Sequence, residues 1–171
     1  IAIHAALLPD GRVTTYGTTA QGKQTGKFIY DIWDYAAAQA DEGHTTLPNS
    51  TITDIFCSSQ TLLPSTGDLL INGGDNYINN RTTNTGNNNT NVLSLADGSL
   101  TPGQLMNRPR WYSSVTTLAN GTQYIQGGSG GADRPEIRDL AGNYTLRDDA
   151  VTASLGALYP RNYLARDGRV F

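Results

Sequence analysis

Residues 62–74 read Leu-Leu-Pro-Ser-Thr-Gly-Asp-Leu-Leu-Ile-Asn-Gly-Gly, and this stretch decides the fold class. It begins as a short apolar strand, turns at Gly67 and continues as a second strand that ends in the pair Gly73-Gly74. Two short apolar runs around a glycine-containing turn predict a β-hairpin. We therefore expect β-structure at the centre of the chain.

The same pattern recurs along the chain. Related copies occupy residues 7–17, 117–128 and 163–171. Aligned on Leu8, Leu63, Leu118 and Leu164, the copies are spaced by 55, 55 and 46 residues. A period near fifty, with hairpins that end in glycine, is typical of kelch-type propeller blades. We expect an all-β fold, a partial kelch-type β-propeller of about three blades of antiparallel strands; a β-sandwich with coincidental hairpins is the alternative.

The repeat divides the chain into blade units within one incomplete propeller domain, residues 1–171. The expected units cover roughly residues 1–55, 56–110 and 111–160, and a further unit starts at 161–171. Propellers typically close with about four to eight blades, so we expect this chain to be part of a larger protein.

Composition narrows the range of partners. The chain has 171 residues, a net charge of −3 and only 16% charged residues, so nothing favours a nucleic-acid partner or an anionic membrane. No apolar run approaches the ~20 residues that a membrane-spanning helix needs.

Two local expectations concern polar or short segments. Residues 72–91, rich in Asn and Thr, should form a long surface loop, and residues 35–40 could make one or two helical turns.

Two residues stand out as candidates for chemistry. Cys57, the only cysteine, and Tyr112 occupy corresponding places in consecutive repeats, so we expect their side chains to meet near one axis. A thiolate sulfur can bond to an activated phenol ring, and the product would be a redox cofactor made from the protein itself. The alternative for Cys57 is a small buried hydrophobic residue with no reactivity.

The sequence around these residues resembles that of a known enzyme family. Residues 53–59, Thr-Asp-Ile-Phe-Cys-Ser-Ser, and residues 107–114, Asn-Arg-Pro-Arg-Trp-Tyr-Ser-Ser, resemble the galactose oxidase and glyoxal oxidase group of copper radical oxidases. The second stretch is closer to the glyoxal oxidase pattern. Weaker similarity covers residues 4–11 and 158–161.

The resemblance implies a specific cofactor and reaction. It implies that Cys57 is joined through a thioether to Tyr112, which is both a copper ligand and the radical site. It also implies that Phe56 lies beside the substrate pocket and that Arg161 orients the substrate. The expected reaction oxidises a small aldehyde or primary alcohol, including a carbohydrate, with O2 to give hydrogen peroxide. An extracellular or secreted location is expected on the same basis.

Some family features have no counterpart here. The remaining copper ligands, a tyrosine beside a histidine and a distant histidine, are expected beyond residue 171, so this portion alone should be inactive. We expect His4 to be a packed, hydrogen-bonded residue and His44 to lie in a solvent-exposed loop. Galactose oxidase stacks a tryptophan on the thioether after its glycine pair, whereas residues 127–131 contain no aromatic residue. Residues 133–136 and 138–139 should form salt bridges at the rim.

Two other classes of function remain open. The chain could belong to a non-catalytic kelch propeller that binds carbohydrate or protein and keeps the blade motifs as structure. It could also be a structural surface domain, as the Asn- and Thr-rich stretch suggests. The reading frame after Phe171 discriminates, because a Tyr-His pair and a later lone histidine favour the oxidase.

Overall fold

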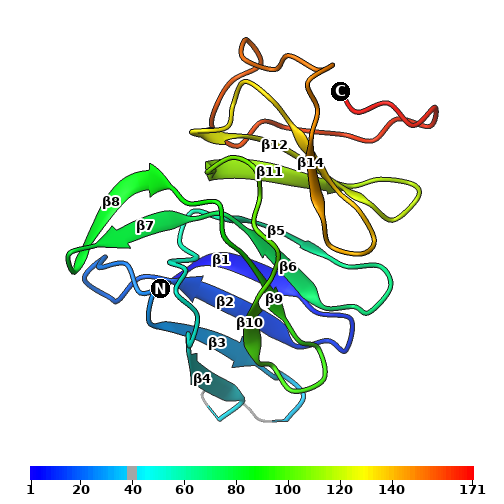
Figure 1. The fold of residues 1–171 in the computed structure, drawn as a ribbon. Helices are drawn as coiled ribbons and strands as arrows, with labels where there is room; N and C mark the ends of the chain where they lie inside the picture. Colours follow the sequence, from blue (N-terminus) through cyan, green and yellow to red (C-terminus); the bar gives the residue numbers. More distant parts are fainter. Residues whose placement is uncertain (38–41) are drawn as a thin grey trace.

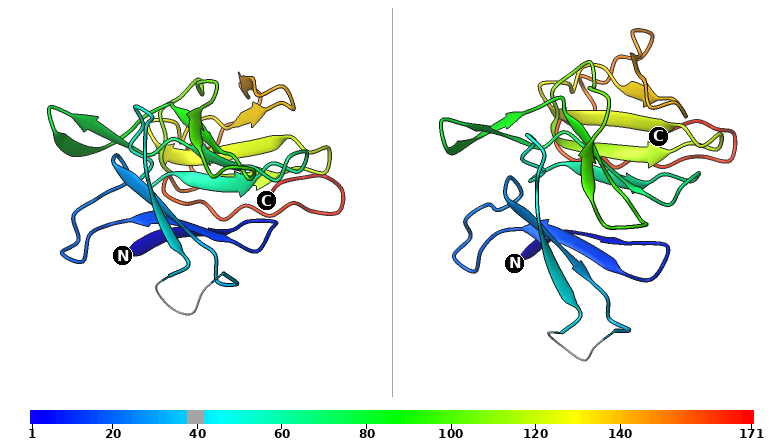
Figure 2. Two further views of the ribbon diagram at one scale, coloured as in Figure 1. Left: turned by 90° about the horizontal axis from the view of Figure 1, so that it is seen from below. Right: turned by 60° about the horizontal axis from the view of Figure 1, so that its bottom comes forward.

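The computed structural model describes residues 1–37 and 42–171. They form three four-stranded antiparallel sheets and a separate two-stranded hairpin, with no helix among the described residues (Figure 1). The prediction of an all-β fold is therefore confirmed. Figure 2 shows the sheets from two further directions, with the blue first sheet at one end of the molecule and the yellow-green third sheet at the other.

The first sheet is a simple meander in chain order. It consists of β1 (Ala2–Leu7), β2 (Val13–Gly17), β3 (Ile29–Trp33) and β4 (His44–Pro48). Leu8 and Arg12 close the turn between β1 and β2, since the Leu8 amide donates to the Arg12 carbonyl oxygen over 2.8 Å.

The second sheet contains the stretch that decided the fold. Its strand order is β10-β9-β6-β5, and a long excursion separates β6 from β9. The strands are β5 (Ser59–Leu62), β6 (Leu69–Asn72), β9 (Thr90–Leu93) and β10 (Leu100–Pro102). Every residue of β6 is buried, as expected for an inner strand of a packed sheet.

The third sheet is again a meander. It contains β11 (Trp111–Thr117), β12 (Gln123–Ser129), β13 (Glu136–Arg138) and β14 (Tyr144–Leu146). Each of the three sheets lies within one of the expected units of about fifty residues. The last copy of the repeat forms a small hairpin, with an isolated bridge between Leu164 and Val170.

The prediction that residues 72–91 form a long surface loop is wrong. The excursion instead forms the hairpin of β7 (Asp75–Ile78) and β8 (Arg81–Gly86), which projects from the sheets (Figure 1). Its two-residue turn, Asn79 and Asn80, has φ values of 50° and 60°. Asn accepts this left-handed conformation readily, and two such residues form the tight turn that matches the twist of a hairpin. The turn therefore allows a hairpin to form although its strands contain few apolar residues.

The short helix expected at residues 35–40 falls partly outside the described residues. Residues 35–37 form a turn rather than a helix, in which Asp34 Oδ1 accepts hydrogen bonds from the amides of Ala36 and Ala37. Residues 38–40 lie outside the part that the structure describes.

The sheets meet through two different kinds of contact. An apolar cluster fills the space between the first and second sheets; it contains Leu8, Tyr16, Tyr30, Ile32, Ile55, Leu69, Ile71, Leu93 and Leu100. Between the second and third sheets, hydroxyl groups pair: Ser59 with Ser113 over 2.9 Å and Thr61 with Thr117 over 3.1 Å. Corresponding strands β5 and β11 thus lie side by side, which brings equivalent repeat positions together.

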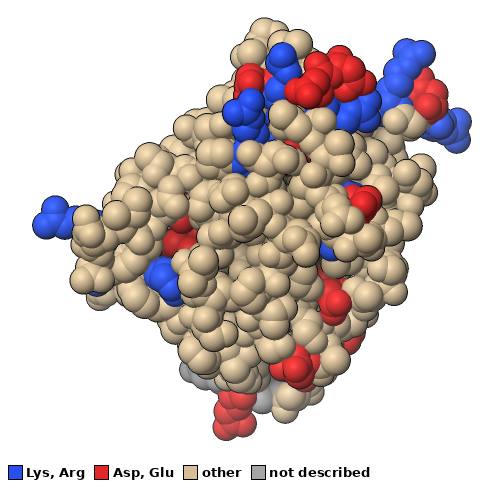
Figure 3. Space-filling view, in the orientation of Figure 1, with Lys and Arg blue, Asp and Glu red and all other residues tan. Residues whose placement is uncertain are grey.

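Charged side chains are distributed unevenly over the surface. On the face shown in Figure 3 they gather toward the end that carries the third sheet, where Lys and Arg alternate with Asp and Glu, and much of the rest is uncharged. In the described part of the chain, no helix has the length and hydropathy needed to cross a bilayer.

Gly73 fills a place that no other residue fits, and it provides a first prediction. Its φ is +68°, and a Cβ atom there would clash with the Arg110 carbonyl oxygen. We expect Gly73→Ala to lower the free energy of unfolding by about 2–5 kcal/mol, because left-handed strain and overpacking add. Urea unfolding followed by tryptophan fluorescence measures the loss.

The matched control is Gly22→Ala. Gly22 has a φ of +80°, but nothing lies within 4 Å of its would-be Cβ atom. This variant should lose only the about 1–2 kcal/mol of left-handed strain. Equal losses for the two variants would contradict the close approach of the Gly73 backbone to Arg110.

Candidate active site

Cys57 and Tyr112 share an unusual backbone conformation at the entrance to equivalent strands. Cys57 has a φ of 62° and Tyr112 a φ of 67°, values that side-chain-bearing residues seldom adopt. The next residues, Ser58 and Ser113, are buried; Ser58 comes directly before β5, and Ser113 lies near the start of β11. Such strain persists where the surrounding structure fixes it, and it is concentrated at functional sites.

The structure brings Cys57 and Tyr112 together. The Tyr112 amide donates to the Cys57 carbonyl oxygen over 2.9 Å, and the Cys57 side chain is buried. The side-chain hydrogen bond with Cys57, together with burial, raises the pKa of Tyr112 to about 12. Burial raises the pKa of the Cys57 thiol to about 12, and the nearby carboxylates of Asp75 and Asp54 act in the same direction. Without a metal, both groups therefore keep their protons at neutral pH.

Tyr159 is a third member of this arrangement that the sequence reasoning missed. Its φ is +45°, its amide donates to the Tyr112 carbonyl oxygen over 2.7 Å, and it is 44% exposed. Its ring stacks on Tyr112 at a centroid distance of 4.8 Å, and Trp111 also stacks on Tyr112 at 4.0 Å. The sequence repeat contains a signal for Tyr159, because residues 57, 112 and 159 are spaced by 55 and 47 residues. The Tyr112 ring is thus flanked by aromatic neighbours although residues 127–131 contribute none.

His4 lies on the other side of Cys57. Its Nε2 accepts a hydrogen bond from the Cys57 amide over 3.0 Å, and its ring stacks on Tyr16 at 4.6 Å. The prediction that His4 is packed and hydrogen-bonded is therefore confirmed. Burial lowers the pKa of His4 to about 4, so the ring is neutral at physiological pH, as its acceptor role requires.

The lowered pKa of His4 predicts a loss of stability in mild acid. The unfolded chain binds a proton at His4 near the ordinary pKa of 6.5, whereas the folded protein does so only near 4. As pH falls through this window, the unfolded state gains protons first, and folding should weaken by about 1–3 kcal/mol. Urea unfolding of metal-free protein at pH 7 and pH 4.5 measures the change.

The control for this titration is His4→Gln. Its amide oxygen can replace Nε2 as the acceptor for the Cys57 amide but does not titrate. The variant should show a smaller loss of stability over the same pH interval. An identical pH dependence in both proteins would mean that other groups cause it.

A cavity of about 420 Å³ opens beside the Cys57–Tyr112 pair. Its walls include His4, Ser58, Ser113 and Tyr159. These residues come from the three sheets and the segment that follows them, so the cavity lies where the repeats converge. Ser58 and Ser113, which follow Cys57 and Tyr112 in the chain, line it, whereas Cys57 and Tyr112 themselves do not.

Phe56 and Arg161 face other spaces. Phe56 lines a groove of about 620 Å³ with Phe28 and Tyr77, whose rings meet edge to face at 5.3 Å. Arg161 is exposed and lines a separate hollow of about 250 Å³ with Tyr124. Phe56 directly precedes Cys57 in the chain, but its side chain lines a different space from the cavity beside Tyr159. Arg161 lines a third space.

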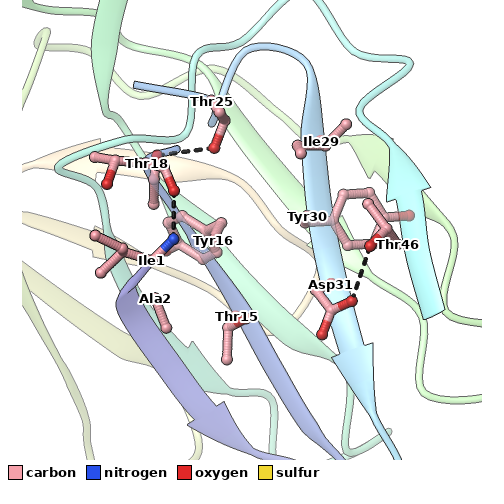
Figure 4. A pocket seen from close by; sticks show the side chains of 11 residues that line it. Ile1, Ala2, Thr15, Tyr16, Thr18, Thr25, Ile29, Tyr30, Asp31 and Thr46 are labelled. Atoms are coloured by element: carbon pink, nitrogen blue, oxygen red, sulfur yellow. Dashed lines mark hydrogen bonds between the residues drawn. The ribbon is translucent and has the colours of Figure 1, made fainter. Parts of the chain in front are cut away.

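Another pocket lies on the first sheet, away from Cys57 and Tyr112. Figure 4 shows its wall, which residues of β1 to β4 and of the segment between β2 and β3 form; Thr46 donates to Asp31, and Thr25 donates to the Gly17 carbonyl oxygen. Its volume is about 170 Å³, and it contains none of the residues expected to carry chemistry.

A fully buried guanidinium group lies two residues before Tyr112. Arg110 Nη1 donates to the carbonyl oxygens of Gly127 and Gly131 over 2.6 and 2.8 Å, and Nη2 donates to that of Arg134 over 2.7 Å. Both Nε and Nη2 donate to Glu136 Oε1. Burial lowers the pKa of Arg110, and the adjacent Glu136 carboxylate opposes this shift.

The prediction that residues 133–136 and 138–139 form salt bridges at the rim is wrong for Glu136. Among the described residues, the one ion pair at this rim joins Asp133 to Arg108 at 4.0 Å, between largely exposed side chains. Glu136 is completely buried, and its Oε2 accepts from the Asn107 amide over 2.6 Å while Oε1 accepts from the Arg108 amide over 3.2 Å. The sequence offered no signal for this, because a Glu in a polar stretch is usually exposed.

The prediction that His44 lies in a loop is wrong. His44 begins β4, stacks on Trp33 and bonds through Nδ1 to Asp31 Oδ2 over 2.6 Å. Its ring is largely open to solvent on the first sheet. It belongs to no cluster with Cys57 or Tyr112.

The donor set for copper is only partly present. Phenolate oxygen suits Cu(II), so Tyr112 can supply one ligand, and its raised pKa means that binding would release a proton. Residues 1–37 and 42–171 contain no group of three or more His, Cys, Asp or Glu side chains that could hold a metal. The described residues therefore fit a copper site as one ligand with its sulfur neighbour, and the other ligands would have to be supplied elsewhere.

Comparisons with known proteins support the fold. No family model matches the chain, and no curated protein matches it. A solved structure described as a "novel fungal alcohol oxidase with catalytic diversity among the AA5 family, in complex with copper" is similar, with 22% identity and a TM-score of 0.61. The match covers 82% of this chain but only 29% of that protein. The partial propeller fold is confirmed by this likeness.

Proposed function

We propose that this chain is part of a copper radical oxidase that oxidises a small aldehyde or primary alcohol with O2 and releases hydrogen peroxide. The observation that carries the proposal is the close approach of Cys57 and Tyr112, two residues from adjacent repeats that are both held in left-handed backbone, with the Tyr112 amide 2.9 Å from the Cys57 carbonyl oxygen. The likeness to a fungal copper alcohol oxidase supports it. A secreted location remains part of the proposal and follows from the same family resemblance.

The first chemical step makes the cofactor. The Cys57 sulfur bonds to the ring carbon beside the Tyr112 hydroxyl, the S–H and C–H bonds break, and two electrons and two protons pass to O2, which becomes hydrogen peroxide. Sulfur then donates electron density to the ring and makes it easier to oxidise. Rigid strands of two adjacent sheets keep the reacting atoms in fixed positions, as a radical site needs.

The chain's own residues have distinct roles in substrate oxidation. Tyr112, as phenolate, would hold copper, which would supply a one-electron acceptor when bound. Trp111 and Tyr159 stack on the Tyr112 ring and exclude water from it. The substrate enters through the cavity beside Tyr159.

Copper-dependent peroxide production tests this function. The full-length protein, loaded with copper, should release peroxide from primary alcohols or small aldehydes, and removal of copper by a chelator should stop it. Cys57→Ala is the matched variant, because it removes the sulfur and leaves Tyr112 in place. Copper-independent turnover, or equal turnover by this variant, would contradict the proposal.

A non-catalytic binding propeller is the second candidate. The groove formed by Phe28, Phe56 and Tyr77 favours it, since partly exposed aromatic rings with polar neighbours suit sugar or protein ligands. The sequence after Phe171 distinguishes the two candidates. A Tyr-His pair and a later histidine support the oxidase, and their absence supports the binding module.

A further inference from the structure

The 107–113 segment carries Tyr112 and is held almost entirely by polar contacts. Within it, the Arg110 amide donates to the Asn87 carbonyl oxygen over 2.9 Å, and the Arg110 carbonyl oxygen accepts from the Gly74 amide over 3.1 Å. The Asn107 and Arg108 amides are bound by Glu136. The segment is thus fixed on both sides before it reaches the strained Tyr112.

Arg110 also holds the strand opposite Tyr112. In the β11–β12 pair, Trp111 lies across from Ser129 and Ser113 across from Gly127, with Tyr112 between them. The Arg110 guanidinium binds the Gly127 carbonyl oxygen, so it fixes the strand that faces Tyr112. One side chain therefore links the segment before Tyr112 to the strand opposite it.

The same group acts on the segment that carries Tyr159. The Gly128 amide donates to the Ala157 carbonyl oxygen over 2.6 Å, and a Cβ atom at Gly127 would touch Pro160. The residues around Tyr159 therefore rest on the Gly127–Gly128 turn that Arg110 holds. The Arg110 guanidinium thus contacts the turn on which the segment of Tyr159 rests.

We propose that Arg110, anchored by Glu136, is a positioning residue that holds Tyr112 over the Cys57 sulfur. A buried ion pair is weak evidence for stability, since its desolvation offsets its attraction, and conformational specificity is the better reason to retain it. The planar guanidinium matches this role because it directs several donors at once, to three carbonyl oxygens and one carboxylate. This inference rests on the proposed function only for the cross-linking step.

Arg110→Lys is the informative variant. Lysine keeps the positive charge beside Glu136 but lacks the fork that reaches Gly127, Gly131 and Arg134 at the same time. The matched control is Arg108→Lys, which changes an exposed side chain of the same segment whose nearest acidic partner is 4.0 Å away.

The first measurement is alkylation of Cys57 in the metal-free, full-length protein. If Arg110 serves stability alone, the alkylation rate rises only by the factor by which the equilibrium constant of global unfolding rises. If it positions Tyr112, the rate in Arg110→Lys rises by more than that factor, because the thiol loses its cover locally. A rise equal to the unfolding factor, or none, would overturn the inference.

The second measurement is the rate at which Cys57 and Tyr112 become linked after copper and O2 are added. We expect the rate in Arg110→Lys to fall by about 10²-fold, as for a displacement of reacting groups by about 1 Å. An unchanged rate also overturns the inference while the proposed function stands. If the protein without substitutions forms no link between Cys57 and Tyr112, the proposed function fails. The alkylation result then decides the role of Arg110 by itself.

Discussion

Tyr112→Phe should abolish alcohol or aldehyde oxidation by the copper-loaded, full-length protein. The variant keeps the ring that Trp111 and Tyr159 contact but removes the hydroxyl that would bind copper and carry the radical. Loss of a group on which the chemistry depends lowers turnover by roughly 10⁴-fold or more. Peroxide release, measured over a range of substrate concentrations, should show a loss of kcat rather than a rise in KM alone.

The control is Tyr163→Phe. Tyr163 lies 59% exposed in the hairpin near the end of the chain, and its ring contacts Phe171, in a tilted arrangement, rather than Tyr112. Its variant should keep the full turnover rate. Tyr112→Phe with more than a tenth of the normal kcat would show that the reaction does not use this phenol.

The largest effect on stability should follow replacement of either member of the Arg110–Glu136 pair. Arg110→Met leaves the Glu136 carboxylate buried without its counter-ion, and Glu136→Leu leaves the Arg110 guanidinium in the same condition; both side chains are 0% exposed. An uncompensated buried charge costs about 3–5 kcal/mol of unfolding free energy. Urea unfolding of each variant measures the loss.

An exposed ion pair supplies the comparison. Arg147 pairs with Asp149 over 2.5 Å, but both side chains are largely in water. Arg147→Met should change the free energy of unfolding by no more than about 1 kcal/mol. If Arg110→Met and Arg147→Met cost the same, the Arg110–Glu136 pair is not buried in solution.

The sheets could be predicted because their signals are local and repeated. Turn glycines such as Gly11, Gly67 and Gly121, each with positive φ, recur at fixed distances from apolar strands. Repetition also allowed Cys57 and Tyr112 to be placed near each other, since equivalent positions of stacked repeats lie side by side. No further information was needed for either expectation.

The features that were missed depend on contacts between distant residues. The β7–β8 hairpin escaped notice because its strands are polar and its Asn79-Asn80 turn contains no glycine. Glu136 was expected at the rim because only the fold reveals Arg110, which is 26 residues earlier in the sequence, beside it. Tyr159 was passed over because its spacing from Tyr112 is shorter than the spacing between the first two repeats.

The covalent state of Cys57 tests the central claim most directly. The full-length protein, treated with copper and O2, would be digested and its peptides examined by tandem mass spectrometry. The account predicts one species in which the Cys57 and Tyr112 peptides are joined, lighter than their sum by a pair of hydrogen atoms. Separate peptides, with Cys57 fully alkylated, would contradict it.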